Sequence, residues 1–418
     1  MFKKKVTNLL KILGPGFITG ASDDDPSGIG TYAQTGAQFG HQQNFVPLFS
    51  LPSMISIQEM CGRIGIVTGK GIGAILRLHY AKPIQLFAVI LLTLANTVNI
   101  GADLGAMAAS AQLLFPAFPF SAFLILFTAL ILILIIIIPY KKYASILKWL
   151  TFSLFCYIGV AAFVSISWKE VLQQTFIPAT TFSKDSVMNI VALLGTTISP
   201  YLFFWQTNQE VEEEIAVKKM SPGKSWHITW HDVKTMRVDT IFGMFFSNLI
   251  AFFIIIAAAE TLHKNGITHI TTAQEAAQSL APFAGSAASA LFALGIIGTG
   301  MLAVPILAAS ISYAWSEILK WNKGLNKTWQ QAEKFYSIII GVTLVGVVIN
   351  YTALQPFQLL YYSAVFNGIS APILIFIIIH IANNKKIMGK YKNSKTSNII
   401  GLLTGIIMAV ASILLFIL

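Results

Sequence analysis

Long apolar segments recur along the whole chain, and each is long enough to form a helix that crosses a membrane. Such a helix needs about 20 apolar residues. Hydropathy places eleven segments near residues 14–36, 45–66, 84–113, 120–138, 144–165, 187–209, 240–261, 284–318, 335–350, 357–381 and 399–418. Only 11% of the residues are charged, whereas soluble proteins carry about 25%. The sequence therefore predicts an all-α polytopic membrane protein with eleven transmembrane helices in one domain.

The basic residues predict how these helices are oriented. With the N-terminus in the cytoplasm and the segments alternating, 25 of the 28 lysines and arginines fall in inner loops, and only Lys169, Lys184 and Lys264 fall outside. Inner loops of membrane proteins are enriched in Lys and Arg. We therefore expect a plasma-membrane protein with a cytoplasmic N-terminus and an extracellular C-terminus. The net charge of +11 is a topology signal rather than a nucleic-acid surface, so the expected surroundings are the lipid bilayer, with no obligate protein partner.

Two of the eleven segments are interrupted near their middle. The first contains Asp23, Asp24, Asp25 and Pro26, and the sixth contains Ser199 and Pro200. Proline removes a backbone donor and breaks a helix. Unwound backbone at membrane depth is tolerated only inside the protein or along a cavity. Paired interruptions at corresponding places in two halves are typical of a transport site near the bilayer midplane.

The two interrupted segments occupy equivalent places in two sets of five. Residues 14–165 hold the first five segments and residues 187–381 the next five, while 399–418 forms an additional helix. Because five is odd, the second set runs in the opposite direction through the membrane. This predicts a 5+5 inverted repeat with broken helices one and six.

Asp25 is the first candidate for a cation ligand, because an acidic residue inside a membrane is costly and marks function. Its alternative role is to cap the half-helix that begins at Pro26, and the two roles are compatible. Asp23 and Asp24 are expected slightly outward, as caps or as groups that attract cations. In the third segment, Thr93, Asn96, Asn99 and Asp103 share one helix face, which fits either a wet pathway or hydrogen bonds between helices.

Other polar residues have a weaker connection with transport. Glu59 is spaced for a local ion pair with Arg63, and the carboxylates from Glu210 to Glu214 either attract cations or form a solvated charged run. His227 and His231 have the spacing of metal ligands but lack further ligands nearby, and Cys61 and Cys156 fit buried apolar positions. No nucleophile–base set or cofactor motif is present, so we expect neither an enzyme nor a bound cofactor.

Several motifs resemble the NRAMP divalent-metal transporters. They are Gly14–Phe17, Asp25-Pro26, Gln34–Gly40, Arg63–Lys70 and Ala102–Leu104. The similarity extends along nearly the whole chain and is most specific in the first three segments. The resemblance implies a LeuT-like fold in which helices one and six hold the transported metal, with Asp25 as the family's aspartate.

The departures from the family pattern concern the metal ligands. The family typically has asparagine where this chain has Gly28, and Met-Pro-His where it has Ser199, Pro200 and Tyr201. The glutamate expected three residues after Asp103 is Ala106. This pattern resembles the NRAMP-related magnesium transporters, in which the methionine is replaced and proton coupling is absent. Oxygen ligands suit Mg²⁺ and Mn²⁺, whereas thioether sulfur favours softer metals.

These observations predict a carrier that moves Mg²⁺, and also Mn²⁺, into the cytoplasm by alternating access without proton coupling. The expected metal site comprises Asp25, Gly28, Thr196 and Ser199, with Asp23, Asp24, Asn96, Asn99, Asp103 and Tyr201 in supporting or pathway positions. One alternative is a proton-coupled Mn²⁺ or Fe²⁺ importer that uses Asp103. Another is a sodium-coupled carrier of organic solutes on the same scaffold, although three clustered aspartates would repel a substrate carboxylate.

Overall fold

The computed structural model describes residues 14–138, 153–178, 180, 182–216 and 228–418. Every regular element in these residues is helical. The longer helices are α2 (Pro15–Asp23), α3 (Pro26–Phe39), α4 (Phe45–Thr68), α5 (Ile72–His79), α6 (Lys82–Leu114), α7 (Phe120–Ile137), α9 (Phe155–Phe163), α10 (Trp168–Phe176), α11 (Lys184–Thr197), α12 (Pro200–Ala216), α13 (Trp230–Thr261), α16 (Ala288–Leu319), α17 (Glu333–Ile349), α18 (Pro356–Asn383) and α20 (Lys395–Ile417). Short helical turns are η2 (His263–Asn265), α14 (Ala273–Ala277), η3 (Gln278–Leu280), α15 (Ala281–Ala284), η4 (Gly285–Ala287), η5 (Trp329–Gln331), α19 (Lys385–Met388) and η6 (Gly389–Tyr391).

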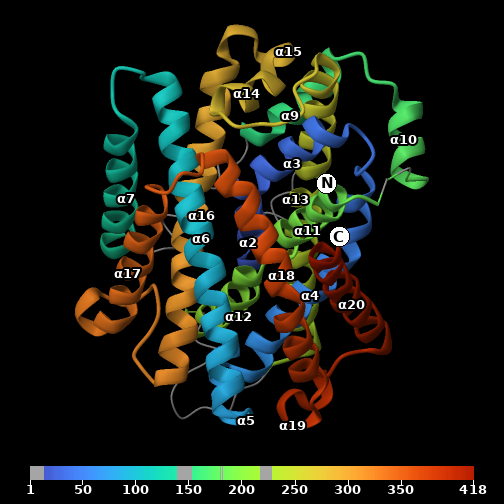
Figure 1. Cartoon of the computed structure of the whole chain (residues 1–418). Helices are drawn as coiled ribbons and strands as arrows, with labels where there is room; N and C mark the ends of the chain where they lie inside the picture. Colours follow the sequence, from blue (N-terminus) through green and yellow to red (C-terminus); the bar gives the residue numbers. More distant parts are fainter. Residues whose placement is uncertain (1–13, 139–152, 179, 181, 217–227) are drawn as a thin grey trace, which may run out of the picture.

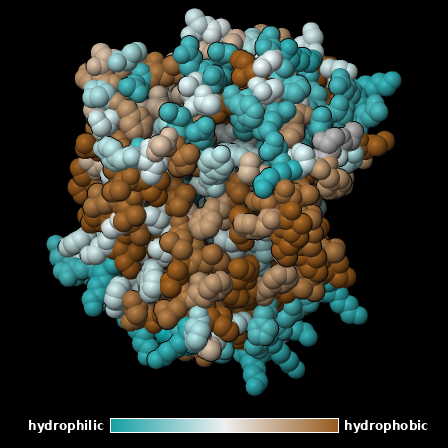
Figure 2. Space-filling model, viewed as in Figure 1, coloured by the Kyte–Doolittle hydropathy of each residue, from teal (hydrophilic) through white to brown (hydrophobic). Residues whose placement is uncertain are grey.

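The helices form a bundle whose outer surface suits a membrane. Seven helical stretches in the described residues are long and apolar enough to cross a bilayer. On the face that Figure 2 shows, hydrophobic residues cover the middle of the molecule and hydrophilic residues gather at the two ends. These features confirm an integral membrane protein. The count of eleven crossings and the inverted repeat stay predictions, and residues 144–152 of the fifth expected segment lie outside the described part.

Both expected helix interruptions are present. The first separates α2, which ends at Asp23, from α3, which begins at Pro26; the second separates α11, which ends at Thr197, from α12, which begins at Pro200. A proline at the first helical position costs nothing, because its missing N–H would have no intrahelical partner there. The interrupted helices lie centrally, with α6, α13, α16 and α18 packed around them (Figure 1).

Glycines bring α2 into backbone contact with α13. A Cβ atom at Gly20 would lie 2.3 Å from the carbonyl carbon of Gly243, and one at Gly16 would lie 2.7 Å from the amide nitrogen of Thr240. Gly16 and Gly20 are four residues apart and so lie on one helix face, the spacing that lets membrane helices approach closely. The first half-helix is therefore seated directly on the α13 backbone.

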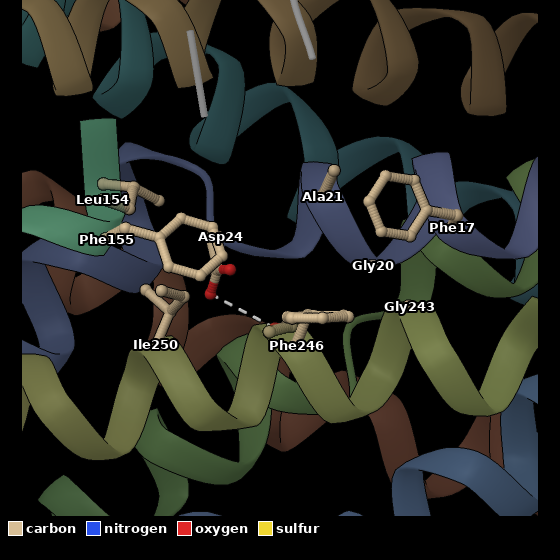
Figure 3. Close-up of a pocket in the computed structure, with 10 residues that line it drawn as sticks. Phe17, Gly20, Ala21, Asp24, Leu154, Phe155, Gly243, Phe246 and Ile250 are labelled. Atoms are coloured by element: carbon tan, nitrogen blue, oxygen red, sulfur yellow. Dashed lines mark hydrogen bonds between the residues drawn. The ribbon is translucent and has the colours of Figure 1, made fainter. Parts of the chain in front are cut away.

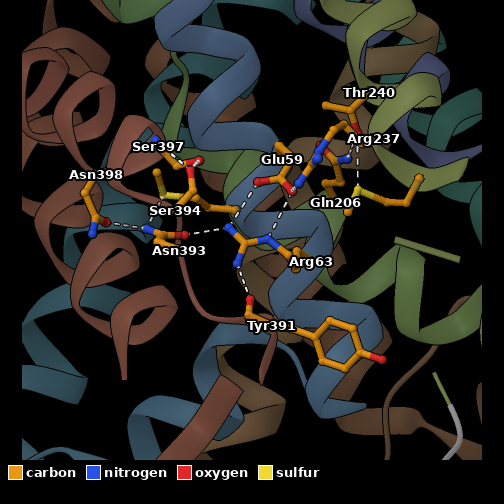
Figure 4. Close-up of polar contacts among 12 residues, drawn as sticks. Glu59, Arg63, Gln206, Arg237, Thr240, Tyr391, Asn393, Ser394, Ser397 and Asn398 are labelled. Atoms are coloured by element: carbon orange, nitrogen blue, oxygen red, sulfur yellow. Dashed lines mark hydrogen bonds and ion pairs between the residues drawn. The ribbon is translucent and has the colours of Figure 1, made fainter. Parts of the chain in front are cut away.

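A charged network joins three parts of the chain at the α5/α19 end of the bundle (Figure 4). The Glu59 carboxylate on α4 accepts hydrogen bonds from Arg63 on the same helix, at 3.0 and 3.1 Å, and from Arg237 on α13, at 2.8 Å. Arg63 also donates to the carbonyl of Tyr391 and to the side chain of Asn393. The predicted Glu59–Arg63 ion pair is thus confirmed. The network ties α4 and α13 to the segment that leads into α20.

Replacing Gly20 with alanine should strongly destabilise the protein, because the new methyl group meets backbone atoms that cannot rotate away. Overpacking of this kind costs about 1–3 kcal/mol or more. The measurement is the apparent melting temperature of the purified protein in detergent, followed by size-exclusion chromatography after heating. Gly341→Ala in α17 is the matched control, since no atom lies within 4 Å of its Cβ position. Equal melting temperatures for the two variants would contradict the proposed role of the glycine contact.

Candidate functional site

Asp25 lies at the first interruption, where it caps α3. One carboxylate oxygen accepts hydrogen bonds from the Ser27 hydroxyl and the Gly28 amide, both at 2.7 Å, and the other accepts one from the Asn99 side chain on α6 at 2.8 Å. The residue is only 2% exposed. The capping role suggested by the sequence is confirmed. The oxygen that accepts from Ser27 and Gly28 uses both of its lone-pair positions, whereas the oxygen that accepts from Asn99 keeps one free for a cation.

The polar face of α6 turns toward the interruption. Asn99 joins Asp25 to α18, because its side-chain oxygen accepts a hydrogen bond from Ser363 at 2.8 Å. Asn96 instead donates to the Leu307 carbonyl on α16 at 3.1 Å. Asp103 is fully buried, and neither of its carboxylate oxygens accepts a hydrogen bond in the described structure. The stripe therefore combines interhelical hydrogen bonds with one buried carboxylate that has no such bond.

The second interruption faces the first. The Tyr201 hydroxyl on α12 donates to the Ser22 carbonyl on α2 at 2.7 Å, which links the two broken helices. The Ser199 hydroxyl donates to the carbonyls of Gly195 and Thr196, both at 2.8 Å. It therefore satisfies carbonyls released by the break, and its oxygen stays available as an acceptor. The Thr196 hydroxyl is buried and lies near that of Tyr32, without a hydrogen bond of normal geometry to any described residue.

The absence of a side chain at Gly28 lets oxygen atoms from both interruptions lie close to its backbone. A Cβ atom there would lie 3.1 Å from the main-chain oxygen of Asp23 and 3.1 Å from the Thr196 hydroxyl oxygen. The ring edge of Tyr32 lies 3.4 Å from the same point. A side chain at this position would press on all three groups, so glycine lets the two interruptions approach each other closely. This places three of the four predicted site positions, Asp25, Gly28 and Thr196, next to one another.

The start of α2 is held by a residue that sequence reasoning missed. Asp239 on α13 accepts hydrogen bonds from the amides of Gly14 at 2.9 Å, Gly16 at 2.7 Å and Phe17 at 3.2 Å. A carboxylate at a helix N-terminus is favourable because it satisfies free N–H groups and opposes the helix dipole. Asp239 lies just before the predicted apolar segment 240–261. Its place beside that segment was the one sequence feature that could have marked it as a structural residue.

Several other sequence candidates lie away from this junction. Glu210 is buried and Glu212 accepts hydrogen bonds from Asn326 and the Leu325 amide, at 2.9 and 3.2 Å, so the alternative of a freely solvated run is wrong for these two. His227 and residues 218–219 lie outside the described part. Cys61 and Cys156 are free thiols. Within the described residues, no three His, Cys, Asp or Glu side chains gather as a metal cluster.

Comparison with known proteins identifies the family. A model described as natural resistance-associated macrophage protein-like matches residues 16–418. The chain belongs to the NRAMP family. This confirms the resemblance found in the sequence.

The relatives are transporters of similar length. The divalent metal cation transporter MntH of Caldanaerobacter subterraneus subsp. tengcongensis is 24% identical over 96% of this chain and 91% of its own length. MntH of Staphylococcus saprophyticus is 25% identical over 98% and 92%. The crystal structure of the Eremococcus coleocola manganese transporter superposes with a TM-score of 0.79 at 18% identity and covers 97% of this chain and 86% of that one. At that identity the superposition establishes the NRAMP transporter fold alone.

Removing the Asp239 carboxylate should free the first turn of α2. Hydrogen bonds to a charged group contribute about 1.5–3 kcal/mol each, so Asp239→Ala should raise amide hydrogen exchange at residues 14–17 at least about tenfold. Exchange would be measured by mass spectrometry on the purified protein. Asp232→Ala is the matched control, because Asp232 lies on the same helix and caps its start through Thr229. Unchanged exchange in Asp239→Ala would show that other contacts hold α2.

Proposed function

We propose that this NRAMP-family protein carries Mg²⁺, and also Mn²⁺, across the plasma membrane into the cytoplasm by alternating access. The proposed orientation follows the distribution of basic residues and puts the α5/α19 end of the bundle in the cytoplasm. Transport of a divalent metal is supported by the relatives, which are named as divalent metal cation transporters. In this scheme the cation binds where the two helix interruptions meet, with Asp25, Gly28, Thr196 and Ser199 as the site.

The chemistry of this junction is the observation that carries the choice of metal. The interruptions contribute carboxylate, hydroxyl and main-chain oxygen atoms. Ser199 occupies the position where the family typically has methionine, whose thioether favours softer metals. Mg²⁺ usually binds through one or two carboxylates and keeps several waters, because it loses its hydration shell reluctantly. With glycine at position 28, no side chain stands between the Asp23 main-chain oxygen and the Thr196 hydroxyl. The Asp25 carboxylate, held by Ser27, Gly28 and Asn99, supplies a fixed charge.

A proton-coupled Mn²⁺ or Fe²⁺ importer is the second candidate, and Asp103 favours it. This carboxylate is buried without a hydrogen bond, as expected of a group that gains and loses a proton. A proton relay needs further titratable groups. The two positions where the family typically has glutamate and histidine hold Ala106 and Tyr201 in this chain. Tyrosine ordinarily titrates near pH 10, and Tyr201 uses its proton to bind the Ser22 carbonyl. Uptake without proton coupling fits this set better.

The test of metal transport is an uptake assay in proteoliposomes with Mg²⁺, Mn²⁺, Ca²⁺ and Na⁺. We expect uptake of Mg²⁺ and Mn²⁺, and its loss in Asp25→Ala, because the variant lacks the main charged ligand. The exposed Asp185 gives the control substitution Asp185→Ala, which should transport normally. Normal uptake by a folded Asp25→Ala protein would refute the site. Uptake of softer metals with exclusion of Mg²⁺ would refute the proposed selectivity.

Metal entry should not acidify the liposome interior. A membrane potential of 100 mV contributes about 2.3 kcal/mol per charge, or about 4.6 kcal/mol for a divalent ion, enough for a gradient above about a thousandfold. The potential alone therefore drives accumulation. The measurement is a pH-sensitive dye enclosed with the transporter, at fixed potential. A metal-dependent fall in internal pH that disappears in Asp103→Asn would establish the proton-coupled alternative instead.

A further inference from the structure

The short connection between α18 and α20 is strongly basic. It carries five exposed lysines, which we call the α19 lysine cluster: Lys385, Lys386, Lys390, Lys392 and Lys395. No acidic residue follows Glu333 in the sequence, so the connection has no acidic neighbour along the chain. Among the described residues, none of the ion pairs involves a lysine of the cluster.

The folded protein does not use this charge for its own stability. At the same end of the bundle, Arg63 and Arg237 both pair with Glu59, whereas the α19 lysine cluster has no such partner. Lys395 is the first residue of α20, where the helix dipole disfavours positive charge. The positive-inside bias accounts for the sign of the charge at this end, but not for its concentration in one connection. An anion outside the protein would be attracted to such a cluster.

Membrane helices on both sides place the cluster at the level of the lipid headgroups. Both α18 and α20 are long and apolar enough to cross a bilayer. Between the exposed lysines, Met388 and Tyr391 are buried. The Tyr391 ring packs against that of Trp230, with centroids 4.7 Å apart, and Trp230 is 52% exposed. Tryptophan and tyrosine concentrate at the membrane–water interface, and lysine side chains extend their charge into the same layer.

The backbone that carries the lysines also belongs to the charged network of Figure 4. Arg63 on α4 donates to the Tyr391 carbonyl and to the Asn393 side chain. The Tyr391 hydroxyl donates to the carbonyl of Ile228, two residues before α13 begins. A molecule that holds this connection in place therefore also holds α4 and the start of α13.

We propose that the α19 lysine cluster binds the headgroups of anionic phospholipids in the adjacent leaflet. In the proposed orientation this is the cytoplasmic leaflet, whose surface is negatively charged. Each lysine near such a surface strengthens binding about fivefold. Bound headgroups fix the connection, and Arg63 transmits this to α4 and α13. Only the choice of leaflet rests on the proposed function, through its orientation, and the lipid surface is a property beyond metal transport.

Native mass spectrometry of the full-length protein tests this surface. Dioleoylphosphatidylglycerol and dioleoylphosphatidylcholine are added separately to the delipidated protein in detergent, and we expect the anionic lipid to bind at least about tenfold more tightly. The variant Lys385→Gln/Lys386→Gln should bind it at least about tenfold more weakly, because two contributions of about fivefold are lost. The control Lys169→Gln/Lys184→Gln removes the same charge from exposed lysines that each precede an acidic residue, and should bind normally.

Amide hydrogen exchange gives a second readout, of the contact with α4 and α13. Exchange at residues 388–394 and 228–232 should be slower in nanodiscs with equal parts of the two lipids than in pure phosphatidylcholine, and Lys385→Gln/Lys386→Gln should abolish the difference. Equal affinities for the two lipids, or equal binding of phosphatidylglycerol by the two double variants, would overturn the proposal. Displacement of the lipid by inorganic phosphate would also overturn it, in favour of a soluble phosphate. Neither readout involves a metal, so either result leaves the proposed metal transport to its own test.

Discussion

Backbone groups released by the two helix interruptions have to find partners within the protein, because the hydrocarbon core offers none. The surrounding residues supply them. Tyr201 donates to the Ser22 carbonyl, Asp25 accepts from the Gly28 amide, and Ser199 donates to the carbonyls of Gly195 and Thr196. Each partner comes from one of the interrupted helices. The Tyr201 bond links the two interruptions, whereas the other bonds satisfy each interruption locally.

Several buried polar atoms near the interruptions have no hydrogen-bond partner among the described residues, as do others elsewhere in the bundle, such as those of Gln58 and Asn367. Asp23, Tyr32, Thr196 and Asp103 each have at least one such atom in the described structure. A protein that buried these groups for stability alone would be expected to pair them. The proposed cation site lies beside some of these oxygen atoms, at the position of Gly28.

The half-helix α2 connects this junction with the α5/α19 end of the bundle. Its last residue, Asp23, lies at the interruption, and its first turn is held by Asp239. Glycines seat it on the α13 backbone. The Glu59–Arg63–Arg237 network meanwhile fixes α4 against α13. The Asp239 hydrogen bonds and the glycine contacts thus hold α2 on a helix that is itself tied to α4.

Sequence reasoning located the interruptions, the membrane class, the family and the capping role of Asp25, because each rests on local pattern. Proline and clustered aspartates have the same effect on a helix whatever surrounds it. It did not find Ser247, Ser363, Tyr32 or Asp239. Serines inside apolar segments were a weak signal, since a hydroxyl can bond to its own helix, as that of Ser363 also does to Leu360.

The difference between Asp23 and Asp24 shows most clearly what the sequence could not predict. In sequence they are identical neighbours, and both were expected in outer, supporting positions. Only the packing of α13 and α3 against the end of α2 decides that Asp24 faces an apolar cavity (Figure 3) while Asp23 keeps a free buried oxygen. The sequence by itself determined that charge interrupts a membrane helix at this place. The tertiary structure decided which carboxylate keeps a buried oxygen without a hydrogen-bond partner, because the surroundings of both include α13, whose Ser247 is 224 residues from Asp23.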